Sequence, residues 1–85
     1  MAEPKICDVF DAAVCAQRIR HLRVNVLNMR IDDFAEKAGI AGPTIRHYEH
    51  ARCTPGAYAV FNICKAHGVS ADWLLGLKED GKDEA

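Results

Sequence analysis

The segment IDDFAEKAGIAGPTIRHYEHA, residues 31–51, constrains the fold more than any other part of this chain. Its apolar spacing predicts two short helices joined by about three residues, and helices joined so closely must cross at short range. Such a crossing needs a small residue on the first helix, a residue able to adopt positive φ at the turn, and an apolar anchor on the second helix. Ala35, Gly39 and Ile45 fill these three places.

Helical patterns also precede and follow this segment, and no strand pattern is convincing. The five expected helices cover about residues 9–26, 31–38, 42–50, 55–67 and 71–75. Asp8 is expected to cap the first helix, Thr54 followed by Pro55 to open the fourth, and Ser70 to cap the fifth. One apolar face of the first helix is formed by Cys15, Ile19, Leu22 and Val26.

These patterns predict an all-α fold of five helices in one domain, residues 8–77. An N-terminal tail, residues 1–7, precedes it, and an acidic C-terminal tail, residues 78–85, follows. No apolar run is long enough to span a membrane, and residues 1–7 lack the apolar core of a signal peptide. A cytoplasmic location is therefore expected.

The four cysteines are Cys7, Cys15, Cys53 and Cys64. Without a secretory signal or a closely spaced pair, they are expected to be reduced and mostly buried, rather than to form disulfides or a zinc site. His47, His50 and Cys53 are spaced by three residues, so metal chelation is an alternative, although no fourth ligand is apparent. No cofactor site or catalytic arrangement stands out, and an enzyme is not expected.

The spacing of Ala35, Gly39 and Ile45 is that of a helix-turn-helix, a DNA-binding motif. Residues 16–77 resemble the Cro and phage-repressor type of helix-turn-helix domain, also called XRE-like. The matching segments are Arg18-x-x-x-Leu22-Arg23, Asp33-Phe34-Ala35-Glu36-Lys37, Thr44-Ile45-x-x-Tyr48-Glu49, Arg52-x-x-Pro55 and Gly68-Val69-Ser70-Ala71-Asp72-Trp73-Leu74-Leu75-Gly76. The resemblance implies a lambda-repressor-like fold with a central helix-turn-helix, in a prokaryotic or phage protein.

The resemblance also implies that the third helix faces the major groove of double-stranded DNA. The residues expected at base edges are Gly42, Pro43, Thr44 and His47. Those expected at phosphates are Arg30, Arg46, His50 and Arg52, since a basic side chain suits a phosphate. The alternative for Arg46, His47 and Arg52 is an ordinary solvated residue. Glu49 is expected to pair with an arginine of the first helix, and His67 to be half-buried and structural.

Two pairs of residues depart from the family pattern where DNA contact is expected. Arg30-Ile31 stands where the family usually has a capping Ser or Thr and then a Gln that binds a phosphate. Gly42-Pro43 offers no side-chain donor or acceptor, which leaves Thr44 and His47 for direct readout. Specificity is therefore expected to be modest, or to depend on DNA shape or on a partner.

The net charge of −1 conceals an uneven distribution. Residues 16–53 hold seven basic and four acidic side chains, whereas the remainder holds four basic and eight acidic ones. Positive charge therefore collects where a phosphate backbone would lie.

Together these features predict a sequence-specific DNA-binding transcriptional regulator, a repressor that acts as a homodimer. The resemblance implies association through the C-terminal helices, near Trp73 and Leu77. Two alternatives remain open: a protein-interaction module on the same fold that does not bind DNA, and an antitoxin-like regulator with a protein partner. Gly42-Pro43, Ile31 and the slightly acidic total charge favour the interaction module.

Overall fold

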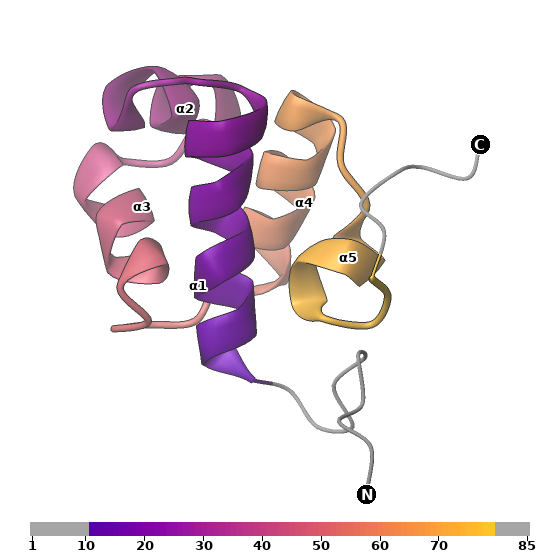
Figure 1. Cartoon of the computed structure of the whole chain (residues 1–85). Helices are drawn as coiled ribbons and strands as arrows, with labels where there is room; N and C mark the ends of the chain where they lie inside the picture. The colour runs from indigo at the N-terminus through magenta and orange to yellow at the C-terminus, as the bar shows by residue number, and fades with distance from the viewer. Residues whose placement is uncertain (1–10, 80–85) are drawn as a thin grey trace, which may run out of the picture.

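The computed structural model describes residues 11–79, and over that range it is entirely helical (Figure 1). Its elements are α1 (Ala12–His21), η1 (Leu22–Val26), α2 (Ile31–Ala38), α3 (Gly42–Glu49), α4 (Ala57–His67) and α5 (Ala71–Leu75). Helix α1 packs against α3 and α5, α2 packs against α3 and α4, and α4 packs against α5. The predicted all-α fold of five helices is confirmed. Within residues 11–79, no helix has the length and apolar character needed to cross a membrane.

One hydrophobic core joins all five helices. Its largest fully buried side chains are Phe34, Ile19, Leu22, Ile45, Ile63, Leu74 and Cys15. Ala35 is buried where α2 meets α3, and Gly39 ends α2 in the left-handed conformation with φ 68°. The Gly39 and Ile40 amides donate to the carbonyls of Glu36 and Ala35, which satisfies the last turn of α2. The predicted crossing is confirmed.

The first helix begins later than predicted. Its cap is Asp11, whose carboxylate accepts a hydrogen bond of 2.9 Å from the Ala13 amide, so the helix starts at Ala12. Asp8, which was expected to cap it, lies outside the described residues.

The last turn of the first helix also differs from its prediction, because η1 is a π-helical turn. The Leu27 amide donates to the Leu22 carbonyl five residues earlier, at 2.9 Å, whereas an α-helix bonds residues four apart. This turn therefore contains one residue more than an α turn. Val26, predicted to share the apolar face of Leu22, is rotated away from it and is 61 % exposed. Leu27 packs against the core in its place.

The fourth helix also begins later than predicted. Thr54 is exposed and caps nothing, and Pro55 precedes the helix rather than opening it. The Pro55 ring is buried and Gly56 remains extended, so the first helical turn forms from Ala57 onward.

His67, the last residue of α4, has the structural role that was expected. Its ring stacks on Phe34 with 4.1 Å between centroids, and its Nε2 donates to the Phe34 carbonyl across 3.2 Å. Burial lowers the pKa of His67, although the hydrogen bond opposes this shift. The neutral ring is therefore favoured at pH 7, and the contact joins α4 to α2.

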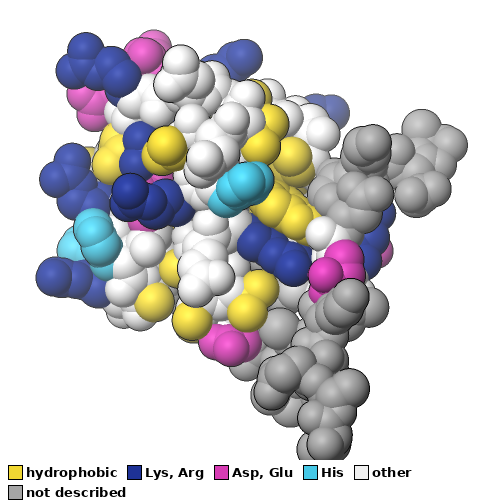
Figure 2. Space-filling model, viewed as in Figure 1, with side chains coloured by type: hydrophobic (Ala, Val, Ile, Leu, Met, Phe, Trp, Pro, Cys, Tyr) yellow, Lys and Arg dark blue, Asp and Glu magenta, His cyan; other side chains and the backbone are white. Residues whose placement is uncertain are grey.

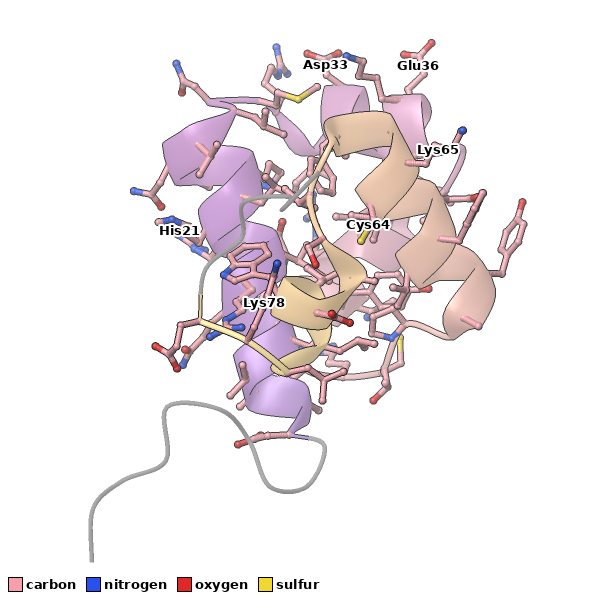
Figure 3. The ribbon with its side chains drawn as sticks, turned by 90° about the vertical axis from the view of Figure 1, so that its right-hand side faces the viewer. His21, Asp33, Glu36, Cys64, Lys65 and Lys78 are labelled. Atoms are coloured by element: carbon pink, nitrogen blue, oxygen red, sulfur yellow. The ribbon has the colours of Figure 1, made fainter. Side chains whose placement is uncertain are left out.

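The cysteines only partly match the expectation of buried, reduced thiols. Cys15, Cys53 and Cys64 are all free, but Cys53 is exposed, because it lies in the loop after α3, whereas Cys15 is buried. Burial raises the pKa of Cys15 to about 11, so it remains a protonated thiol at neutral pH. Cys64, labelled in Figure 3, is half-buried on α4. Cys7 lies outside the described residues.

Arg18 fastens α5 to α1. Its guanidinium donates to the carbonyl oxygens of Trp73 and Lys78 and lies over the Trp73 ring, 5.4 Å from the centroid. Trp73 is consequently buried within its own domain, at 9 % exposure. Trp73 was predicted to lie near a dimer interface, but this packing leaves little of its indole surface exposed to a second protein.

Candidate nucleic-acid interface

Helix α3 has one buried face and one face open to solvent. Ile45 and Tyr48 are buried in the core, whereas Arg46 and His47 are exposed. Basic and histidine side chains gather on the left-hand edge of the molecule in Figure 2, over α3 as it is placed in Figure 1. A helix whose core contacts all lie on one side can present its other side to a large partner.

An ion pair attaches α3 to the end of the first helix. The Arg23 guanidinium donates from Nε and Nη2 to the two carboxylate oxygens of Glu49, at 2.6 and 3.0 Å, and from Nη1 to the Met29 carbonyl at 3.0 Å. The two side chains are 13 % and 3 % exposed. The hydrogen bond to Glu49 raises the pKa of Arg23, which stays charged. The predicted pairing of Glu49 is confirmed, and the one acid of α3 is thereby neutralised.

The C-terminus of α3 is closed by a left-handed residue that is not glycine. Ala51 has φ 58°, and its amide donates to the Tyr48 carbonyl while the Arg52 amide donates to the His47 carbonyl at 2.9 Å. This pair of bonds fixes the backbone of Arg52 directly behind α3. The sequence pattern did not indicate it, since an alanine rarely takes this conformation.

A shallow hollow of about 330 Å³ lies at the N-terminal end of α3. It is lined by Gly42, Pro43, Arg46 and His47, and by Asp32 from the first turn of α2. The absent side chain of Gly42 opens this space: a Cβ built on it would lie 3.2 Å from Oδ1 of Asp32. The sequence reasoning missed Asp32. The glycine at position 42 could have indicated it, because a helix residue without a side chain leaves space that a side chain of the neighbouring helix can occupy.

The hollow brings together four of the eight predicted contact residues, Gly42, Pro43, Arg46 and His47, and the other four do not line it. Arg30 is the exposed N-cap of α2, and Thr44 is half-buried on α3. His50 is exposed, with its Nδ1 3.1 Å from the Arg46 carbonyl, and Arg52 is exposed in the following loop. Among residues 11–79, no group of three His, Cys, Asp or Glu side chains could hold a metal ion, so His47, His50 and Cys53 do not form the cluster considered above.

Comparison with known proteins identifies the fold through solved structures. Protein-family models and curated protein sequences give no match. The N-terminal domain of SinR from Bacillus subtilis is similar with a TM-score of 0.71 and 25 % identity, over 80 % of this chain and 99 % of that one. The P22 c2 repressor, in complex with a synthetic operator, has a TM-score of 0.70 and 25 % identity, over 76 % and 97 %. The chain has the fold of the Cro and phage-repressor type of helix-turn-helix domain.

A third structure, the restriction-modification controller protein C.AhdI from Aeromonas hydrophila, is 17 % identical with a TM-score of 0.70, over 75 % of this chain and 96 % of that one. At that identity it supports the fold alone. In helix-turn-helix terms α2 is the first helix of the motif and α3 is the recognition helix. The predicted lambda-repressor-like architecture is confirmed.

Proposed function

We propose that this helix-turn-helix domain is a DNA-binding transcription regulator that places α3 in the major groove and represses by occupying a promoter. The observation that carries the proposal is the charge on the open face of α3. Because Arg23 neutralises Glu49, α3 and the loop behind it present Arg46, His47, His50 and Arg52 with no unpaired acid of their own. Phosphate contacts supply most of the affinity of such an interface. The solved structures named above include an operator complex, which supports the same function.

Within this proposal the residues have separate roles. Arg46 and Arg52 contact phosphates, because a guanidinium presents several donors and stays charged. Arg30 reaches a phosphate from the start of α2, and so supplies by charge alone the phosphate contact that Ile31 cannot make in place of the family's Gln. His47 and Thr44 meet base edges, and Pro43 offers an apolar contact such as a thymine methyl group.

A salt titration tests the proposal. The probe is duplex DNA from immediately upstream of the chain's own gene. Wild-type affinity is expected to fall by decades between low and moderate salt. Arg46→Ala and Arg52→Ala should each weaken binding about equally for all sequences, and should each reduce the slope of log affinity against log salt by about one.

Lys65→Ala is the matched control, since it removes one positive charge from α4, on a different part of the surface (Figure 3). Its slope should equal that of the wild type. Failure of the wild type to bind this DNA at low salt would reject the regulator and favour a protein-interaction module, which the chemically bare Gly42-Pro43 pair also favours. Unchanged slopes for both arginine variants would show that the phosphate assignments are wrong.

We also propose that the regulator is a homodimer that associates through α4 and α5. An apolar hollow of about 440 Å³ there is lined by Pro55, Ala57, Val60, Phe61, Ala71 and Leu75. Phe61 is 63 % exposed and Tyr58 is 74 % exposed, although both are large and aromatic. Exposed aromatic side chains beside an apolar hollow are typical of an interface between proteins. Leu77, 56 % exposed, extends the same C-terminal region.

Phe61→Glu is expected to dissociate this dimer, because two-fold symmetry buries the new charge twice. Sedimentation velocity over a range of protein concentrations measures the effect. Val26→Glu is the control, since Val26 is equally exposed but lies on η1. A wild type that remains monomeric at the highest concentration would contradict the proposed dimer, while leaving DNA binding possible for monomers that pair on an operator.

A further inference from the structure

The carboxylate of Asp32 lies where a side chain of the recognition helix would otherwise be. Gly42 begins α3 and contributes no side chain, and Oδ1 of Asp32 is 3.2 Å from the position a Cβ on Gly42 would take. Asp32 also lines the hollow, together with Pro43, Arg46 and His47. An acceptor carried by α2 therefore stands at the end of α3 that is expected to meet the bases.

The Asp32 carboxylate has no hydrogen-bond or ion-pair partner among residues 11–79. Asp32 is also exposed to solvent. An ionised carboxylate is an acceptor with about four lone-pair positions, all available to a donor from outside. Arg46 lines the same hollow and offsets part of the repulsion between this charge and a phosphate backbone.

We infer that Asp32 is a specificity-determining residue, which accepts a hydrogen bond from the N4 amino group of a cytosine opposite the first turn of α3. This inference rests on the proposed function. In the major groove the cytosine amino group is a donor that carboxylates recognise, whereas guanine and thymine present acceptors at their corresponding edges, which a carboxylate repels. Asp32 thus supplies the polar readout that Gly42 and Pro43 lack.

The competing role for Asp32 is that of a plain negative charge. Such a charge would weaken binding to every sequence to a similar extent, since phosphate repulsion carries no base information. The two roles predict different results for removal of the charge. If Asp32 recognises a base, its substitution changes the preferred DNA sequence. If it only repels phosphates, its substitution changes the affinity for all sequences alike.

The test compares wild type, Asp32→Asn and Asp33→Asn on a pool of duplexes with randomised positions, selected by binding and then sequenced. Asp33 is the matched control, because it is an exposed acid in the same first turn of α2 but does not line the hollow. Figure 3 shows it at the outer edge of α2, next to Glu36. In Asp32→Asn the preference for cytosine at one position of each half-site should fall at least about fivefold, with adenine gaining, since Asn pairs with adenine. Asp33→Asn should keep the wild-type preference.

Each outcome decides between the proposals. If the wild type selects a sequence but Asp32→Asn selects the same one with equal discrimination, the role of Asp32 is overturned and the regulator stands. A uniform gain in affinity for both variants, without a change in preference, overturns it in the same way. If the wild type binds no duplex of the pool even at low salt, the proposed function fails and this inference fails with it.

Discussion

Glu49→Ala is expected to destabilise the domain by about 2–4 kcal/mol, because it leaves the part-buried Arg23 guanidinium without its counter-charge. Arg23 is 13 % exposed and donates two hydrogen bonds to Glu49, so water can replace little of what is lost. A domain of this size has a free energy of unfolding of about 4–13 kcal/mol, so the variant loses a large part of its stability. Urea or guanidinium unfolding followed by circular dichroism measures the change.

Two further variants separate the ion pair from its surroundings. Glu36→Ala removes an exposed acid from α2 and should change the free energy of unfolding by less than about 0.5 kcal/mol. The double variant Arg23→Met with Glu49→Leu should recover much of the loss, since replacing both charges by apolar groups leaves no unpaired charge and costs only the hydrogen bond from Arg23 to the Met29 carbonyl. A cost below about 1 kcal/mol for Glu49→Ala alone would mean that water reaches the guanidinium, contrary to the burial described above.

Phe34→Ala is expected to cost about 3–5 kcal/mol, through a different mechanism. The Phe34 ring is fully buried at the centre of the core, and its removal leaves a cavity and unstacks His67. Because that stack joins α2 to α4, the neighbouring side chains cannot close the cavity without moving a helix. The same unfolding measurement, made at low protein concentration, reports the loss.

Phe61→Ala is the matched control for this experiment. It removes the same side chain from a site that is 63 % exposed, so it creates no internal cavity and should cost less than about 1 kcal/mol in the monomer. If the two variants were equally stable, the core of the domain would not be centred on Phe34. If Phe61→Ala alone were destabilising, that ring would be buried in solution.

The central motif could be predicted because its requirements are local. The crossing of two short helices fixes a small residue, a left-handed residue and an apolar anchor at set spacings, and Ala35, Gly39 and Ile45 meet them within one segment of chain. The helix ends at Gly68 and Gly76 could also be predicted locally, because glycine readily takes the left-handed conformation that ends a helix. Both glycines have positive φ in the structure.

The errors fell where a tertiary contact, or a change in the local helix type, overrode the sequence pattern. Thr54-Pro55 has the composition of a helix start, yet burial of the Pro55 ring keeps the chain extended as far as Gly56. Val26 has the spacing of a core residue, yet the π turn of η1 rotates it into solvent. A pattern of one period cannot show where the period changes.

The sequence by itself determined the helices, the motif and the basic character of α3, because each depends on residues that are neighbours along the chain. Only the tertiary structure decided what the open face of α3 presents. The family resemblance predicted an arginine partner for Glu49, but only the structure showed that this partner is Arg23, 26 positions away, and that the pairing neutralises the acid of α3. Asp32 reaches the hollow beside Gly42 from the other helix of the motif. Such contacts depend on how two helices cross in space, and a spacing along one chain does not specify that geometry.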